Sequence, residues 1–112
     1  MKRTNLGEFE ELTLLTVSVL YQQAYGISIK DEIEKQTGRN LSISAVHSVL
    51  NRLEKKGFVV SWMGGVTQER GGRRKRFFKV TSAGQYALVE VRNIREKLWK
   101  LIPDFSFEGG RK

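Results

Sequence analysis

The chain has 112 residues and a formal net charge of +8, from 20 Lys and Arg residues against 12 Asp and Glu residues. This length suffices for one domain with one modest core and is too short for two. The excess of cations favours nucleic acid or an anionic membrane surface as partner. The sequence has no cysteine, which excludes disulfides and thiolate chemistry. Its richest apolar stretch, residues 12–21, is too short to span a bilayer, and no apolar leader is visible, so we expect a cytoplasmic protein.

Two helices are predicted in the first third of the chain. Asn5 and Glu8 fit the N-cap and N3 positions of a capping box. The helix that follows is so rich in apolar residues that it should be buried on more than one side. Residues 25–26 break it, Ser28 is expected to cap a second helix, and Gly38 is expected to end that helix. Together the two helices should form a helical hairpin.

A third helix should begin at a cap made by Ser42 or Ser44 and end at Gly57. Apolar residues recur in it at spacings of three and four and form one stripe: Ile43, Val46, Val49, Leu50 and Leu53. The opposite face carries short hydroxyls, an amide and cations, which can approach base edges or phosphates: Ser44, Ser48, Asn51 and Lys55, with His47 and Arg52 on the flanks. An ordinary solvated face looks much the same, so this helix alone does not decide the function.

Two short runs, residues 58–63 and 77–80, are predicted as the strands of a β-hairpin. In the first run Phe58, Val60 and Trp62 alternate with the other three residues, and Phe78 and Val80 continue the inner face on the return strand. Phe77 then faces outward, where we expect it to shield the base of the hairpin. The segment between the strands supplies a glycine turn and five cations: Arg70, Gly71, Gly72, Arg73, Arg74, Lys75 and Arg76.

Folding does not require five mutually repelling cations at one hairpin tip. Lys and Arg side chains neutralise phosphates and release condensed counterions, so a polyanion outside the protein best explains them. The alternative is a solvated loop that is basic by chance. The neighbouring third helix, with its small polar face, favours nucleic acid as the partner.

A last helix is expected to begin at Thr81 and to stop at Pro103. It carries a heptad seam of apolar residues: Ala87, Val91, Ile94, Leu98 and Leu101. In a monomer this seam could cover the chain's own first helix. We favour an intersubunit seam, because the span is too short for an independent coiled coil and would pack with the first helix of a partner. A two-fold dimer also doubles the number of base pairs that are read.

The order of these elements predicts a mainly α fold with a small β-hairpin, a winged helix-turn-helix followed by a C-terminal dimerisation helix. Residues 1–80 should form the DNA-binding domain, residues 81–103 the dimerisation helix packed on it, and residues 104–112 a flexible tail. The third helix can enter the major groove while the hairpin tip lies along the backbone or in the adjacent minor groove.

Five short segments in this order resemble PadR-type transcriptional regulators: residues 6–10 (LGEFE), 24–26 (AYG), 53–58 (LEKKGF), 71–75 (GGRRK) and 81–84 (TSAG). The resemblance implies a homodimeric winged-helix repressor whose last helix forms the dimer. It also implies that a small phenolic or drug-like molecule can release the DNA, as in some members. One departure is His47, where the family usually has a tyrosine in the reading helix. We expect no counterpart of the long C-terminal domain of the larger members, because little sequence follows Pro103.

No constellation for catalysis or metal binding is present in the sequence. His47 is the only histidine, and without cysteine a zinc site would need a carboxylate cluster that is not spaced around it. Ser44 and Ser48 on the same helix lack the orienting group and oxyanion hole that nucleophilic catalysis needs. We therefore predict no enzyme, no metal and no cofactor.

The predicted function is a sequence-specific DNA-binding repressor that acts as a homodimer on an inverted-repeat operator. Its expected partners are double-stranded DNA, a second copy of the chain and a small aromatic effector, with no membrane. The first alternative is a ligand-sensing or protein-binding winged helix with secondary DNA binding. The second is a binder of double-stranded RNA or a non-specific nucleoid protein, which would bind all duplexes alike.

Overall fold

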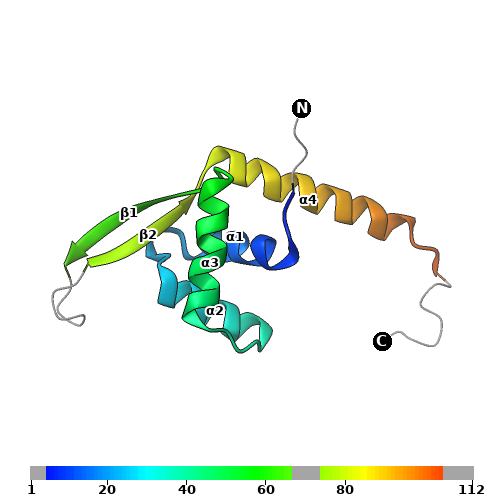
Figure 1. The fold of residues 1–112 in the computed structure, drawn as a ribbon. Helices are drawn as coiled ribbons and strands as arrows, with labels where there is room; N and C mark the ends of the chain where they lie inside the picture. The colour runs from blue at the N-terminus through cyan, green and yellow to red at the C-terminus, as the bar shows by residue number, and fades with distance from the viewer. Residues whose placement is uncertain (1–4, 67–73, 105–112) are drawn as a thin grey trace.

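The computed structural model describes residues 5–66 and 74–104 (Figure 1). Within these ranges it contains four α-helices, one short 3₁₀ helix and one antiparallel pair of strands, which confirms the predicted mainly α class. In chain order the elements are α1 Glu8–Leu20, η1 Tyr21–Gln23, α2 Gly26–Thr37, α3 Ile43–Lys55, β1 Val59–Val66, β2 Arg74–Val80 and α4 Ser82–Leu101.

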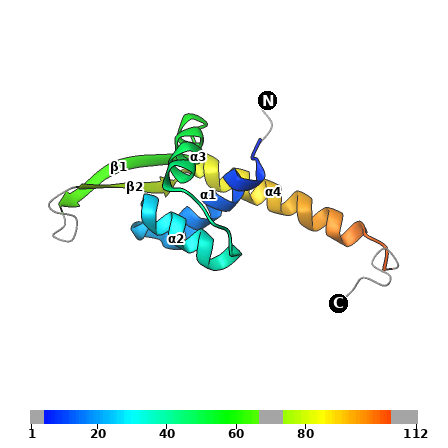
Figure 2. The same ribbon diagram turned by 60° about the horizontal axis from the view of Figure 1, so that its bottom comes forward.

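The hairpin and the C-terminal half of α4 leave the helical body in opposite directions, as Figures 1 and 2 show from two sides. The body consists of α1, α2 and α3 with the base of the hairpin. Among the described helices, none combines the length and the hydropathy that crossing a membrane requires.

The first helix begins later than the sequence predicts. Its N-cap is Gly7, and the N3 residue is Glu10, whose Oε1 accepts a hydrogen bond from the Gly7 N–H at 2.8 Å. The prediction of Asn5 as cap and Glu8 as its partner is therefore wrong. Glu10 takes this position because its carboxylate also binds Arg52 and Lys56 at the end of α3. Residue spacing along α1 cannot reveal such tertiary contacts.

The second helix begins two residues before the predicted cap. Tyr25 is the N-cap of α2, and Ser28 lies at N3, where its hydroxyl oxygen accepts from the Tyr25 N–H at 2.9 Å and the hydroxyl donates to the Gln23 carbonyl at 2.6 Å. Ser28 thus closes the turn from inside the helix. The predicted end is confirmed, because Gly38 adopts the left-handed conformation with φ 76°.

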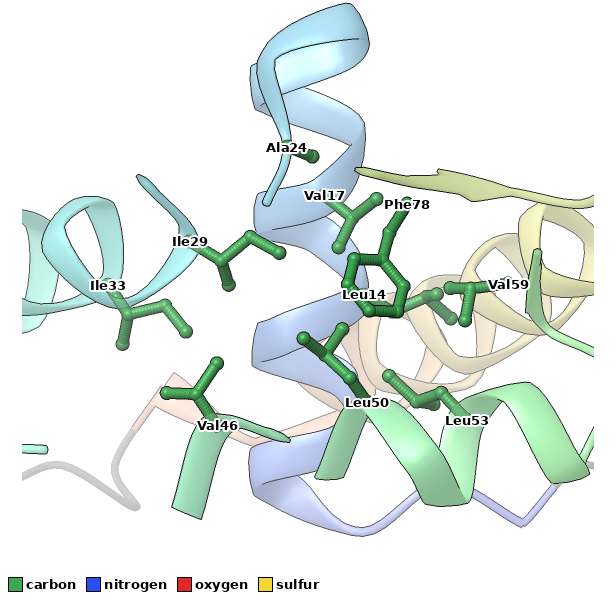
Figure 3. Close-up of a cluster of buried hydrophobic side chains, with 10 residues drawn as sticks. All are labelled: Leu14, Val17, Ala24, Ile29, Ile33, Val46, Leu50, Leu53, Val59 and Phe78. Carbon is green, nitrogen blue, oxygen red and sulfur yellow. The ribbon is translucent and has the colours of Figure 1, made fainter. Parts of the chain in front are cut away.

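The core forms where α1 passes between the other elements. Leu14 and Val17 of α1 lie next to Phe78 of β2, and side chains of α2 and α3 close around them (Figure 3). The buried cluster consists of Leu14, Val17, Ala24, Ile29, Ile33, Val46, Leu50, Leu53, Val59 and Phe78. The third helix contributes three of these residues, so its position is fixed by the core.

The two strands are longer than predicted. They pair with Val59 opposite Val80, Ser61 opposite Phe78 and Met63 opposite Arg76, and the register shifts between Met63 and Val66. Val59 and Phe78 are buried, whereas Val60 and Trp62 are exposed. The inner face of β1 is therefore the set that begins at Val59, not the set that includes Val60 and Trp62.

The last helix is capped as predicted and ends close to the predicted stop. The hydroxyl oxygen of Thr81 accepts from the Gly84 N–H at 3.0 Å, and the hydroxyl donates to the Gly57 carbonyl at 2.7 Å. Gly84 is required here, because an added Cβ would lie 2.3 Å from the carbonyl oxygen of Phe58. The start of α4 is thus held tightly against the turn between α3 and β1.

Candidate nucleic-acid interface

The polar face of α3 lies in solvent, and its apolar face is buried. Ser42 caps the helix, since its hydroxyl oxygen accepts from the Ala45 N–H at 3.1 Å. Four members of the predicted stripe are buried, whereas the fifth, Ile43 in the first turn, is exposed. All six predicted DNA contacts of this helix are exposed: Ser44, His47, Ser48, Asn51, Arg52 and Lys55.

The C-terminal end of α3 is tied to α1 by a carboxylate. Glu10 accepts from Lys56 Nζ at 2.8 Å and from Arg52 Nε at 3.4 Å. Burial alone would raise the pKa of Glu10, but hydrogen bonds from Lys56 and the Gly7 N–H, the charge of Lys56 and the contact with Arg52 outweigh it and lower the pKa. Arg52 is therefore exposed to solvent and paired with Glu10.

The predicted wing cations divide between the strand and the segment before it. Arg74, Lys75 and Arg76 belong to β2 rather than to a loop, because the strand begins three residues earlier than predicted. Arg70, Gly71, Gly72 and Arg73 lie outside the described residues.

The three cations of β2 differ in their surroundings. Arg76 donates to Glu54 Oε1 at 2.9 Å and to the Ser61 hydroxyl at 3.0 Å, which links β2 to both α3 and β1. Lys75 Nζ lies 4.1 Å from the centre of the Tyr25 ring, a cation–π contact. Arg74 is exposed. Arg74 and Lys75 are thus the described wing cations with most charge available to a partner.

A hollow of about 350 Å³ separates the start of α3 from the hairpin. Its lining combines cations of β2 with apolar side chains and the imidazole of α3: Tyr25, Gly26, Ile27, Ile43, His47, Met63, Arg74, Lys75 and Arg76. Ile43 and His47 of α3 border the same hollow as the cations of β2, so the first turns of α3 and the cationic strand lie on one side of the molecule.

His47 packs against the start of α2. A Cβ added at Gly26 would lie 2.9 Å from His47 Cε1, so a larger residue at position 26 would displace the imidazole. The histidine is therefore at the edge of the exposed helix face, above the hollow. Within the described ranges, no group of three His, Cys, Asp or Glu side chains is placed to hold a metal ion.

An aromatic cluster supports the base of the hairpin. The Phe77 ring stacks on Trp62 at 6.0 Å between centres and meets the edge of Tyr25 at 5.6 Å. The Phe78 N–H also donates to the Ala24 carbonyl at 2.8 Å. Phe77 is half-buried and shields the hairpin base, as predicted. The contacts of Tyr25, Glu10 and Glu54 were not predicted from the sequence, because no periodicity connects these residues with the ones that they contact.

The predicted seam of α4 is mostly uncovered by its own chain. Ala87 is 2% exposed, but Ile94, Leu98 and Leu101 are 53%, 57% and 70% exposed. Exposed apolar side chains also lie on α1, at Leu15 and Val19. The described part of the monomer therefore does not use the seam to cover its first helix beyond the first turns of α4.

A family model described as "Transcriptional regulator PadR-like family" matches residues 14–90. Solved structures share the fold at low identity. A PadR-like transcriptional regulator from Bacillus cereus is 16% identical with a TM-score of 0.68, and the match covers 82% of this chain and 84% of that chain. A PadR family transcriptional regulator from Eggerthella lenta is 22% identical with a TM-score of 0.63, over 83% and 80% of the two chains.

The protein smu.1704 of Streptococcus mutans is 20% identical with a TM-score of 0.66, and the match covers 98% of both chains. At these identities the similarity shows the fold alone. The comparison with curated proteins gave no significant match.

Proposed function

Because this chain belongs to the PadR-like family of transcriptional regulators, we propose that it is a repressor that binds an inverted-repeat operator as a homodimer. Its family makes it a DNA-binding transcription regulator and not an enzyme. One observation carries the proposal: His47, at the edge of the exposed polar face of α3, and the cations of β2 border the same hollow. A single duplex can then touch both.

The outer face of α3 enters the major groove in this proposal. Ser44, Ser48 and Asn51 are short enough to let the helix approach base edges, and the Asn51 amide can bond an adenine bidentately. The flanking Arg52 also meets the major groove, and Lys55 lies towards the C-terminal end of the helix, where phosphates line the groove. His47 contacts the backbone at the N-terminal edge.

The hollow accommodates the sugar-phosphate backbone of the strand between the two contacts. Its apolar lining, from Ile43 and Met63, suits a deoxyribose, and its cations suit a phosphate. Arg74 and Lys75 then position the protein without specifying a sequence. Arg70 and Arg73, outside the described residues, extend the same role along the wing.

The dimer forms through the uncovered part of α4. Ile94, Leu98 and Leu101 lose their exposed apolar area when they pack on the α1 helix of the partner, at Leu15 and Val19. Ala87 is already covered by its own chain, so the interface is centred on the C-terminal half of α4. A small aromatic effector and a cytoplasmic location remain predictions from the sequence.

The test is selection of bound fragments from a random DNA library by the purified protein, combined with sedimentation velocity. We expect an enriched inverted repeat with half-sites about one DNA turn apart, and a dimer in solution. Leu98→Asp should yield monomers that bind DNA weakly. Enrichment of no sequence would support the non-specific alternative, and a monomer that binds a single half-site would reject the dimer.

A further inference from the structure

Glu10 is the one charged residue of the described chain that is buried, with 6% of its surface exposed. Its Oε1 accepts from the Gly7 N–H and from Lys56 Nζ, both at 2.8 Å, and its Oε2 faces Arg52 Nε at 3.4 Å. A buried carboxylate is tolerated when it is paired and hydrogen-bonded in this way. The carboxylate therefore joins the start of α1 to the end of α3.

Arg52 lies in the last turn of α3, and Lys56 is the C-cap residue of the same helix. Arg52 and Lys56 are four residues apart, so their side chains leave the same side of α3 and reach one carboxylate. Lys56 Nζ also donates to the Asn5 carbonyl at 2.6 Å, which adds the segment before α1 to the junction. Rotation of α3 about its axis would break these contacts together.

Glu10 also determines how Arg52 faces solvent. With Nε directed to the carboxylate, the terminal nitrogens of the guanidinium remain for an outside partner, in an orientation set by the fixed plane of the group. The negative charge of Glu10 meanwhile offsets the attraction of Arg52 to any nearby phosphate. Without this partner, the Arg52 guanidinium would bind the nearest phosphate whatever the DNA sequence.

We propose that Glu10 is a positioning residue for sequence recognition: it fixes the rotation of α3 and restrains Arg52, so that base contacts rather than phosphate attraction decide where the protein binds. This inference rests on the proposed function. Two neighbouring acids offer a comparison, since Glu8 pairs with Arg39 after α2 and Glu11 pairs with Arg95 of α4. Among the described contacts of these three acids, those of Glu10 alone reach the reading helix.

The experiment uses full-length Glu10→Gln, which keeps the shape of the side chain and removes its charge. Binding is measured to the inverted-repeat fragment recovered by selection and to a random duplex of equal length, over a series of salt concentrations. We expect tighter binding to the random duplex, a salt slope there that is steeper by about one per subunit, and a roughly tenfold lower ratio of specific to random affinity.

Glu8→Gln is the matched control, because it makes the same charge change two residues away without a contact to α3. It should strengthen binding to both duplexes alike and leave their ratio within about twofold. An equal fall of the ratio in both variants, or an unchanged ratio in Glu10→Gln, overturns the proposal. A lower unfolding temperature with an unchanged ratio would make Glu10 a purely structural residue.

If Glu10→Gln does not fold, Glu10→Asp takes its place. The aspartate keeps the charge and withdraws the carboxylate from Arg52 by about one methylene, so the ratio should fall while the net charge is constant. An unchanged ratio again rejects the inference. The proposed function fails separately, and earlier, if the unmodified protein shows no preference for any selected fragment over the random duplex.

Discussion

Helix α3 and the hairpin differ in how they are held to the body of the protein. Helix α3 sends Val46, Leu50 and Leu53 into the main core and is tied at its C-terminal end by Glu10. The hairpin contributes Val59 and Phe78 at its base, and from there its two strands extend from the body with only each other as neighbours in the sheet. Helix α3 is positioned by the apolar area that it buries in the core, whereas the hairpin is positioned by a few contacts at its base.

This difference suits the two kinds of DNA contact that we propose, base reading by α3 and phosphate contact by the hairpin. Reading base edges requires a side chain placed to a fraction of an ångström, which a core can provide. Contact with phosphates tolerates a looser placement, because charge attraction acts over several ångströms. Damage to the core side of α3 should therefore unfold the protein, whereas damage to the wing should leave the fold intact and alter only DNA binding.

The largest expected effect comes from Leu50→Ala, which opens a cavity beneath α3. Leu50 is completely buried, so the loss of unfolding free energy should be about 2–5 kcal/mol. Urea denaturation followed by circular dichroism measures it. Val60→Ala on the exposed face of β1 serves as contrast and should cost less than about 1 kcal/mol. Equal losses of unfolding free energy in the two variants would contradict the view that α3 is held by the core more firmly than the hairpin is.

The wing is tested by the double variant Arg74→Ala and Lys75→Ala. Removal of two phosphate contacts per subunit should flatten the slope of log K against log salt by about 3–4 units in a dimer. The unfolding midpoint should change little. The matched control is Lys97→Ala with Lys100→Ala on α4, which removes the same charge far from the wing. If the slope of log K against log salt is unchanged, Arg74 and Lys75 do not contact phosphates.

The reading face is tested by Asn51→Ala, whose side chain is exposed and supports no core contact. We expect discrimination at one or two base pairs to weaken by about 1–3 kcal/mol, with stability unchanged. Repeating the fragment selection with the variant measures this. If the ranking of bound sequences is the same for both proteins, Asn51 does not contact bases.

The smallest effect is expected from Glu54→Gln, which breaks the tie between α3 and the hairpin. The Glu54–Arg76 pair is half-exposed, so its loss should cost less than about 1 kcal/mol of stability. Arg76 should become available to phosphate and steepen the salt slope by about one per subunit. Glu32→Gln on α2 controls for the charge change. If it steepens the salt slope as much as Glu54→Gln does, the Glu54–Arg76 contact does not affect DNA binding.

Local patterns predicted most of the elements correctly. The caps at Ser42 and Thr81 and the left-handed glycine at Gly38 depend on the chain within a few residues of each position. The buried stripe of α3 follows from helical periodicity, with Ile43 as the exception because it lies in the first turn beside the hollow. The order of the elements then indicated the winged helix.

Errors occurred where a distant residue decided a local choice. Glu10 takes the place of Glu8 in the first capping box because its carboxylate also accepts hydrogen bonds from Lys56 and Arg52, at the end of α3. The strand β2 extended back to Arg74 because β1 offers a partner as far as Val66. Arg76, grouped with the wing cations by sequence, has Glu54 of α3 and Ser61 of β1 as partners.

By itself the sequence determined the elements, their order, the apolar face of each helix and the basic character of the wing, because these depend on composition and on spacing along one chain. The tertiary structure alone decided which charges are neutralised and which side of the molecule each face occupies. Ion pairs such as Glu10 with Lys56 join residues 46 positions apart, and only packing brings such atoms within hydrogen-bond distance.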